Sequence, residues 1–539
     1  MEPASTARRD SAESRRIASR AITAAACLLV AFALLAPSAG GRITLWSFTR
    51  IPVEALAGVA VVLLMRARGR RVLAAVAGVT LGLVVLVKIV DMGFYVAFDR
   101  PFHPAFDGSS LGPAVDLLAS AVGRAGAIVV VLLAGVLAVA LVAAAAAAVV
   151  RLTRLAVEHR PTAARATAVL GLVWIVCAVS GVQIAQGEPV AARDAVAFGY
   201  DRVQQVRADF RDHRQFVGAL ADDDFQQRQG DELLTALRGK NVVIAFVESY
   251  GRVAVEHPDI APQVNGVLTE GTRGLRTAGF GSRSAFLTSP TAGGASWLAH
   301  ATLQSGLWID NQLRYNTLVA GDRLTLSGAF HHAGWRTVGV VPANTEDWPE
   351  GDFYGFDAYY DVGNAGYRGP SSPFATMPDQ YTLATFHHQE LTSENVPVMA
   401  EIDLVSSHWP WDPVPEPVAW ADVGDGSVFA EAPAPSPSPG GVRAAYADSI
   451  AYSLRTLVSY AQTYGDDDLV LIFLGDHQPA SMVTGRQAGR DVPITIVARD
   501  TAVLDQISGW GWQDGLLPGS DAPVWPMHAF RDRFLTAFG

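Results

Sequence analysis

The sequence predicts an α-helical transmembrane bundle of about five spans, followed by an exported α/β domain with a mostly parallel central sheet. Of the 539 residues, 50% are hydrophobic and only 17% are charged, compared with about 25% charged residues in an average soluble domain. Almost all of the apolar excess lies before about residue 187. After that point short apolar runs alternate with helix-like stretches, which is typical of α/β proteins.

Five apolar segments follow a basic tail over residues 1–20. Each is close to the roughly 20 residues that a helix needs to cross a membrane, so we expect a transmembrane domain over 21–187. The segments are 21–38, 48–65, 72–90, 127–149 and 166–186. The second is the least hydrophobic, since it holds Arg50 and Glu54. The first leaves an alternative open, because a basic start before an apolar core is also typical of a cleaved signal peptide.

The arginines mark one side of the membrane. They cluster before the first segment, between the second and third, and between the fourth and fifth. The positive-inside rule therefore places the N-terminus in the cytoplasm and everything after about residue 187 on the outer face. We expect a multi-pass protein of the cell membrane. Its 41 Lys and Arg residues against 52 Asp and Glu residues give a net charge of −11, which argues against a nucleic-acid partner.

The exported part begins with a polar stretch and continues with an α/β pattern. We expect a helical connector over 188–240, an α/β domain over 241–505 and a C-terminal segment over 506–539. Continuous apolar runs suit strands that are buried on both faces. Such runs lie at 242–247, 336–341, 397–405, 469–474 and 493–498, with helix-like stretches at 296–305 and 445–462. The Pro- and Ser-rich segment 431–441 is predicted to be a flexible surface loop.

Polar side chains follow three of these predicted strands. Glu248 follows the run 242–247, Asp476 and His477 follow 469–474, and His408 follows 397–405. In an open α/β sheet, sites form at the carboxyl ends of the strands, and carboxylate and imidazole are ligands for Zn²⁺ or Mn²⁺. Each residue alone has an ordinary explanation as a solvated, turn or packing residue. Together they favour a metal site.

A metal site of this kind needs a reacting group, and a glycine-rich turn supplies one. Gly293 and Gly294 lead into a helix that begins near Ser296. A hydroxyl at a helix N-terminus lies near backbone N–H groups and the positive end of the helix dipole, which favour an incoming anion. Ser296 as an ordinary N-cap remains an alternative, as do Thr291 and Ser289 as nucleophiles. A Ser-His-Asp hydrolase is less favoured, because the chain has no G-x-S-x-G motif.

The ordered set VVIAFVESYG, GGASWLAHATLQSG, SSHWPWDP and FLGDHQP resembles the sulfatase-like branch of the alkaline phosphatase superfamily. The resemblance covers roughly 241–500 and is nearest to the membrane-anchored lipoteichoic acid synthases and phosphoethanolamine transferases. It implies that 241–505 is a sulfatase-like catalytic domain. It further implies Ser296 as the nucleophile and one divalent ion, Mn²⁺ first and Zn²⁺ or Mg²⁺ otherwise. The implied metal ligands are Glu248, Ser296, Asp476 and His477.

The same resemblance implies three residues that bind substrate. His408 matches the family histidine that contacts the transferred phosphoryl group, Trp348 matches a pocket tryptophan, and His300 stands where sulfatases have Arg. The chain departs from the family at Glu350, where the synthases have Arg. The sulfatase Pro is also absent, so no formylglycine is expected.

The resemblance implies a metal-dependent transferase. It would move phosphoglycerol or phosphoethanolamine from a membrane phospholipid donor to an envelope glycan or lipid acceptor. A sulfatase-like hydrolase, either a phosphodiesterase or a sulfuric ester hydrolase, is the main alternative. A catalytically inactive scaffold and a transporter are the others. The charges of Lys88, in the third segment, and of Asp91, directly after it, suggest the latter.

The arginine distribution makes the orientation testable. A fluorescent protein that matures only in the cytoplasm should give no signal when it is fused to Gly539, because residues 190–539 are expected outside. The same reporter fused before Met1 should be bright. A bright C-terminal fusion would reverse the orientation and remove the exported domain from its expected substrates.

Overall fold

The protein is described by a computed structural model. The described residues are 3–37, 43–98, 101–103, 107, 111–185, 188–345, 348–372, 375–392, 396–411, 414–429, 441–485 and 488–539. The chain divides into two compact units, Met1–Arg211 and Asp212–Gly539. The flexible loop predicted over 431–441 lies outside the described residues apart from Gly441.

The first unit is helical. Its helices are α1 (Pro3–Leu35), η2 (Leu45–Phe48), α2 (Val53–Leu64), α3 (Ala67–Phe98), α4 (Leu111–Glu158) and α5 (Arg160–Ser180), and its short strands are β1 (Ile51–Pro52), β2 (Gln183–Ala185), β3 (Glu188–Pro189) and β4 (Ala191–Ala192). The division between the units falls within helix α6 (Asp194–Ala221). This helix lies in the segment 188–240, for which a helical connector was predicted.

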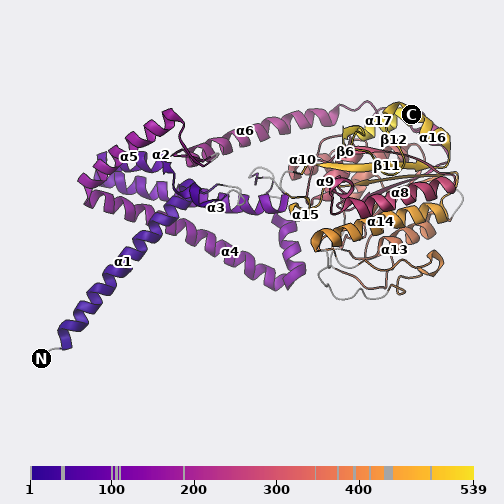
Figure 1. The fold of residues 1–539 in the computed structure, drawn as a ribbon. Coiled ribbons are helices and arrows are strands. Elements are labelled where there is room, and N and C mark those ends of the chain that lie inside the picture. The colour runs from indigo at the N-terminus through magenta and orange to yellow at the C-terminus, as the bar shows by residue number, and fades with distance from the viewer. Residues whose placement is uncertain are drawn as a thin grey trace. The chain divides into compact units, whose positions relative to one another are not determined.

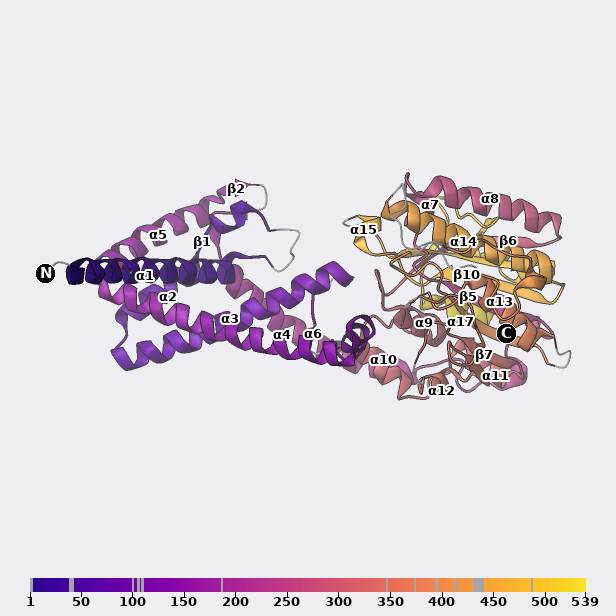
Figure 2. The same cartoon turned by 90° about the horizontal axis from the view of Figure 1, so that it is seen from below.

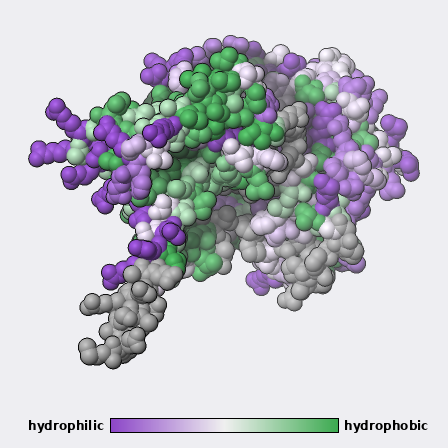
Figure 3. Space-filling model, turned by 60° about the vertical axis from the view of Figure 1, so that its left-hand side comes forward, coloured by the Kyte–Doolittle hydropathy of each residue, from purple (hydrophilic) through white to green (hydrophobic). Residues whose placement is uncertain are grey.

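Within the described residues, four helical stretches are long and apolar enough to cross a membrane: Ser14–Leu35, Ala67–Tyr95, Val122–Glu158 and Arg160–Ser180. Many of their large apolar side chains are exposed, among them Leu132, Val139 and Val179, and the hydrophobic surface is visible in Figure 3. The second predicted segment, 48–65, differs. Its helix α2 has only 12 residues, which span about 18 Å against a hydrocarbon core of about 30 Å. It begins after its N-cap Pro52, and Arg50, two residues earlier, lies outside the helix and pairs with Glu188 and Asp194.

The two charges that suggested a transporter have structural partners within the first unit. The ammonium group of Lys88 donates to the carbonyls of Ala33 and Ala36, at 2.9 and 2.7 Å. These carbonyls lie at the C-terminal end of α1, where helical partners are missing. Asp91 is buried and pairs with Arg202. Both charges therefore hold helices together, which weakens the argument for a transport pathway.

The second unit is an α/β domain around a nine-stranded sheet, shown in Figure 1. The strands are β5 (Asn241–Val247), β6 (Gly281–Thr288), β7 (Arg336–Val340), β8 (Ala358–Tyr360), β9 (Val398–Leu404), β10 (Leu469–Gly475), β11 (Asp491–Ala498), β12 (Gln513–Asp514) and β13 (Val524–Pro526). Their order is β12-β6-β11-β10-β5-β9-β7-β8, with β13 also paired to β6. In the described part, five pairings are parallel and three are antiparallel. The prediction of a mostly parallel sheet is confirmed.

Helices cover both faces of this sheet. They are α7 (Val253–Glu256), α8 (Ala261–Thr277), α9 (Ser296–Ser305), α10 (Gln312–Val319), α11 (Leu326–His332), α12 (Gly351–Tyr354), α13 (Asp379–Phe386), α14 (Val442–Tyr464), α15 (Ser481–Thr484), α16 (Thr501–Gln506) and α17 (Ala529–Phe538), with short turns η3 (Gly230–Glu232), η4 (Thr235–Leu237), η5 (His387–Leu391), η6 (Trp420–Asp422) and η7 (Ser508–Trp510). Figure 2 shows α8 and α14 on one side and α9 and α17 on the other.

The central strand explains why its sequence is continuously apolar. Val243 and Ala245 of β5 pack against α8 and α14, whereas Ile244 and Phe246 pack against α9, α11 and α17. A strand covered on both faces needs apolar residues at every position. Strand β6 was missed because GSRSAFLT holds few of the β-branched residues that mark strands.

A buried ion cluster ties the start of the second unit to its last helix. The carboxylate of Asp223 lies 3.1 Å from Nε of Arg323 and 2.7 Å from a guanidinium nitrogen of Arg531. The side chains of Asp223, Arg323 and Arg531 are only 2%, 3% and 0% exposed. Two buried guanidinium groups therefore share this carboxylate, and Arg531 also pairs with Asp532 at 2.7 Å.

This cluster predicts a large stability effect. Asp223→Asn should destabilise the second unit by about 3–5 kcal/mol, because it leaves buried charge uncompensated. The melting temperature of the full chain in detergent, followed by tryptophan fluorescence, should fall by on the order of 10 °C. Asp224→Asn is the matched control, since Asp224 is exposed and such changes usually stay within about 0.5 kcal/mol. Equal melting temperatures for the two variants would contradict the role of the cluster.

Candidate active site

Three adjacent parallel strands end at the same level of the sheet. Strand β5 lies between β10 and β9, and its register pairs Val247 with Gly475 on one side and with Leu404 on the other. The next residue of β5 is Glu248, and the next residues of β10 are Asp476 and His477. One ligand atom from each of these three residues lies within 4.8 Å of the others. The structure thus brings together the Glu, Asp and His that the sequence placed at strand ends.

Two glycines allow the turns after these strands to pack closely. A Cβ at Gly475 would lie 1.9 Å from the carbonyl oxygen of Tyr250, and one at Gly251 would lie 2.8 Å from Cα of Gln478. Only glycine permits such an approach of backbone to backbone. The amides of Ser249 and His477 both donate to Oδ1 of Asp476, each at 2.7 Å. The glycines of VESYG and GDH therefore serve the geometry of the site.

The loop before α9 brings Ser296 to the carboxylates. Its Gly293 amide donates to the carbonyl of Gln478 at 2.8 Å. The hydroxyl of Ser296 donates to Oε2 of Glu248 at 3.0 Å and lies 3.2 Å from Nε2 of His477. The alternative explanation as an N-cap is wrong, because Ala295 occupies the cap position, with a left-handed φ of 64°, and Ser296 is the first helical residue.

The other two hydroxyls on this loop are engaged with backbone carbonyls. Thr291 donates to Gly294 at 2.6 Å, and Ser289 donates to Asp476 at 2.6 Å. Of the three hydroxyls, only that of Ser296 has bonds to the Glu248 and His477 side chains among the described residues.

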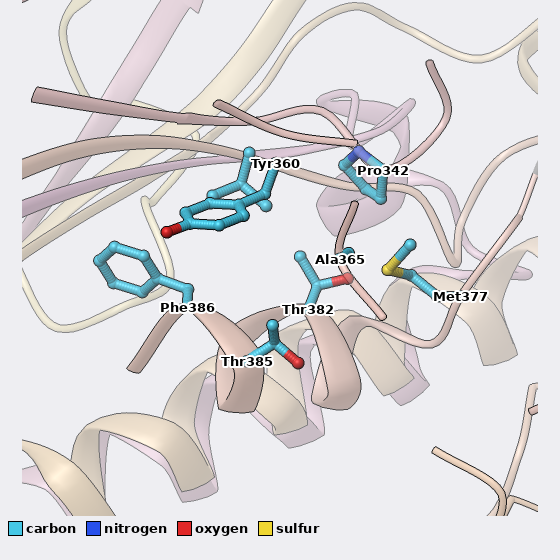
Figure 4. Close-up of a pocket in the computed structure, with 8 residues that line it drawn as sticks. Pro342, Tyr360, Ala365, Met377, Thr382, Thr385 and Phe386 are labelled. Carbon is cyan, nitrogen blue, oxygen red and sulfur yellow. The ribbon is translucent and has the colours of Figure 1, made fainter. Parts of the chain in front are cut away.

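A cavity of about 420 Å³ opens over this cluster. Its lining holds Glu248, Ser296, His300, Asp403, His408, Asp476 and His477, the aromatic residues Phe246, Trp297, Trp409 and Trp411, and the small or apolar residues Ser249, Gly293, Gly294, Ala295, Ala343, Leu404, Val405 and Ala480. None of these lining residues is Lys or Arg. A second cavity, between β7, β8 and α13, holds only about 10 Å³ and is mostly apolar, as Figure 4 shows. It is too small for a substrate.

The site concentrates negative charge in a buried place. Burial and the neighbouring Glu248 charge raise the pKa of Asp476. Burial also opposes ionisation of Glu248, but the imidazoles of His477 and His408 outweigh it and hold the pKa of that carboxyl below its usual range. Burial lowers the pKa of His477, whereas Asp476 and Glu248 raise it further than burial lowers it. Two carboxylates this close cannot both stay ionised without a compensating cation.

The residues present fit a divalent metal ion. Oδ2 of Asp476 is buried and accepts no hydrogen bond from the described residues, which is unusual for a native carboxylate. The ring of His477 donates from Nδ1 to the carbonyl of Gln478 at 2.9 Å, which leaves Nε2 toward the site, as in typical metal-ligating histidines. Glu248, Asp476 and His477, with the Ser296 hydroxyl beside them, are the residues that would hold the ion.

The remaining predicted residues divide into two groups. His300 and His408 line the cavity, whereas Trp348 is not among the lining residues. The Trp348 ring instead packs with Tyr354, Phe356 and Tyr359, at centroid distances of 5.5, 6.1 and 6.0 Å.

Two acidic residues of this region were missed by the sequence reasoning. Glu401 and Asp403 of β9 both approach Nδ1 of His300, at 2.9 and 3.5 Å. Burial lowers the pKa of His300, but Asp403 and Glu401 outweigh it and raise the pKa to about 9. The alternation of Glu401 and Asp403 in MAEIDLV places both on one face of the strand, a signal that was available in the sequence.

Comparisons with known proteins give structural likenesses only. No protein-family profile and no curated protein matches the chain. Solved structures that are similar include the lipoteichoic acid synthase LtaP from Listeria monocytogenes, with 16% identity over 57% of this chain and 74% of that chain and a TM-score of 0.37. A protein in the alkaline phosphatase superfamily from Vibrio parahaemolyticus has 16% identity over 48% and 60%, with a TM-score of 0.35. The Streptococcus pyogenes phosphoglycerol transferase GacH in complex with sn-glycerol-1-phosphate has 11% identity over 60% and 91%, with a TM-score of 0.37. The case for a reaction rests on the residues of the site.

The cluster predicts a metal content that can be measured. The full chain, purified in detergent and loaded with Mn²⁺, should hold about one ion, and the Asp476→Ala, His477→Ala double variant should hold none, because it loses two of the three side-chain ligands. Elemental analysis after desalting gives the number directly. Glu390→Gln is the control, since Glu390 is a buried carboxylate paired with Arg336 and does not line the cavity. Equal metal content in the double variant and the wild type would refute the site.

Proposed function

We propose that this chain is a membrane-anchored, metal-dependent transferase of the sulfatase-like branch of the alkaline phosphatase superfamily. It moves phosphoglycerol or phosphoethanolamine from a membrane phospholipid to an envelope glycan or lipid, on the outer face of the cell membrane. The observation that carries the proposal is the Ser296 hydroxyl, which lies between Glu248 and His477 at the first turn of α9. At this position a possible nucleophile lies beside residues that can bind a metal and at the N-terminus of a helix.

The surroundings of Ser296 suit attack on a phosphodiester. The first N–H groups of α9 and its positive dipole end favour an anionic substrate. Oε2 of Glu248 already accepts the Ser296 hydrogen bond, so it is placed to take the proton as the oxygen becomes a nucleophile. A divalent ion bound at this site lowers the pKa of a nearby hydroxyl and neutralises charge on phosphoryl oxygens.

The proposed reaction has two displacements. In the first, Oγ of Ser296 forms a bond to phosphorus, the bond from phosphorus to the diacylglycerol oxygen breaks, and that oxygen takes up a proton. In the second, an acceptor hydroxyl forms a bond to the same phosphorus and gives up its proton, while the bond to Ser296 breaks and the serine hydroxyl is restored. Each step exchanges one ester bond for another, so no oxidant or nucleotide is required.

The four helices of the described part that are long and apolar enough to cross a membrane support a lipid donor. Anchoring beside the donor raises its effective concentration. Water in place of the acceptor alcohol would make the same site a hydrolase. Incubation of labelled phospholipid with and without an added glycan therefore identifies the acceptor from the products.

Substitution of Ser296 tests the mechanism. Ser296→Ala should lower turnover of labelled phospholipid by on the order of 10⁴-fold or more, because loss of a nucleophile removes the covalent route. Ser296→Thr should keep partial activity, since the hydroxyl remains, and Ser296→Cys should be poor. Mass spectrometry of the Ser296 peptide, trapped with lipid, should show the mass of the transferred group.

The neighbouring hydroxyl provides the control. Thr291→Ala should retain turnover, because its hydroxyl is bonded to the Gly294 carbonyl. Ser296→Ala should keep a melting temperature close to the wild type, since the helix cap is Ala295. If Thr291→Ala abolishes turnover and Ser296→Ala does not, the nucleophile belongs to the earlier turn of the loop.

A further inference from the structure

A chain of buried hydrogen bonds leads from the protein interior to the His300 ring. Gln304 lies one turn after His300 on α9, and its carbonyl oxygen accepts from the backbone amide of Ser327 at 2.9 Å. Its amide nitrogen therefore faces the other way and donates to Oε2 of Glu401. Oε1 of Glu401 is 2.9 Å from Nδ1 of His300. Because Ser327 fixes the orientation of Gln304, the direction of every bond in the chain is determined.

This series of hydrogen bonds also fixes the protonation and the orientation of the His300 ring. A carboxylate only accepts, so Nδ1 carries a proton and donates it to Glu401. The ring stacks on Phe246 with a centroid distance of 3.8 Å, which sets its plane. Among the described residues Nε2 has no hydrogen-bond partner, and His300 lines the cavity of about 420 Å³, so Nε2 is the polar ring atom available to a ligand there.

The residues that line the cavity make His300 a candidate to bind the negative charge of the substrate. An anionic phosphodiester must enter a space lined by Glu248, Asp476 and Asp403, and none of the described residues that line it is Lys or Arg. The two carboxylates around Nδ1, Glu401 at 2.9 Å and Asp403 at 3.5 Å, favour the doubly protonated ring. A protonated imidazole held in this way supplies a charge-assisted donor.

We propose that Glu401 is a positioning residue that holds His300 with Nδ1–H toward the interior and directs Nε2–H at a phosphoryl oxygen of the substrate. The inference rests on the proposed function for the identity of the substrate, whereas the anion contact itself requires only a phosphate group. Glu401 touches no substrate and acts through His300. Gln304 and Ser327 hold Glu401 in turn.

Glu401→Gln tests this series of hydrogen bonds, because glutamine has nearly the same shape as glutamate. Since Gln304 must donate toward residue 401, the new carbonyl oxygen faces Gln304 and the new amide nitrogen faces Nδ1 of His300. Nδ1 must then accept, so the ring becomes neutral and keeps a proton only on Nε2. A neutral donor binds an anion more weakly than a charged one, by about tenfold in affinity for one such bond.

The experiment is a double-mutant cycle with inorganic phosphate as the probe. The full chain in detergent with Mn²⁺ is titrated calorimetrically as wild type, Glu401→Gln, His300→Ala and the double variant. We expect each single variant to lose about tenfold in phosphate affinity and the double variant to lose no more than His300→Ala alone, because Glu401 acts only through His300. Glu390→Gln, the buried carboxylate paired with Arg336, should bind phosphate like the wild type.

Three outcomes would overturn the proposal. The first is an unchanged phosphate affinity in Glu401→Gln. The second is a loss of phosphate affinity in the double variant that equals the product of the two single losses. The third is a second metal ion in the wild type that Glu401→Gln removes. The last result would make His300, Glu401 and Asp403 a metal site, for which their ligand atoms are close enough. If Glu401→Gln fails to fold, Glu401→Asp, which keeps the charge but shortens the reach, must show the same coupling to His300. Coupled phosphate binding without any transfer from phospholipid would refute the proposed function and leave this inference standing.

Discussion

Crowding of negative charge at the ends of three parallel strands is the constraint around which the second unit is organised. The register of β10, β5 and β9 brings Asp476 and Glu248 to one level, where burial makes two ionised carboxylates unfavourable. The surrounding structure supplies the compensation. Two backbone amides donate to Asp476, and the loop before α9 delivers a hydroxyl to Glu248. The oxygen of Asp476 that lacks a donor among the described residues marks where a cation fits.

The sequence could place Glu248, Asp476 and His477 close together because the signals for their positions are local. A fully apolar run identifies a strand covered on both faces, and the carboxyl ends of parallel strands meet at one edge. These two rules bring Glu248, Asp476 and His477 together without any knowledge of the contacts. The helix 296–305 was also predicted with the bounds that α9 has in the structure, since the glycine-rich turn and the polar first residue mark its start. The direction of β11, which is antiparallel to β10, carries no such local signal.

Contacts between distant segments were beyond the reach of sequence patterns. The pairing of His300 with Glu401 joins residues 101 positions apart, and nothing in the spacing of either segment indicates it. The 12-residue α2 is shorter than the predicted segment 48–65, since it begins only after its N-cap Pro52. The partners of Arg50, Glu188 and Asp194, lie far along the chain and could not be identified from its own segment. The packing of Trp348 with Tyr354 and Phe356 likewise depends on tertiary structure.

The two histidine–carboxylate groups of the cavity differ in a way that separates their tasks. His477 turns Nδ1 to a neutral carbonyl and leaves Nε2 beside Glu248 and Asp476, an arrangement that suits a neutral imidazole bound to a metal. His300 turns Nδ1 to two carboxylates, an arrangement that suits a cation. The proposed phosphoryl transfer would use both, because one oxygen must become nucleophilic while charge on the others is neutralised. Because none of the described residues that line the cavity is Lys or Arg, the two imidazoles, which their partners set differently, would serve these needs together with a bound metal ion.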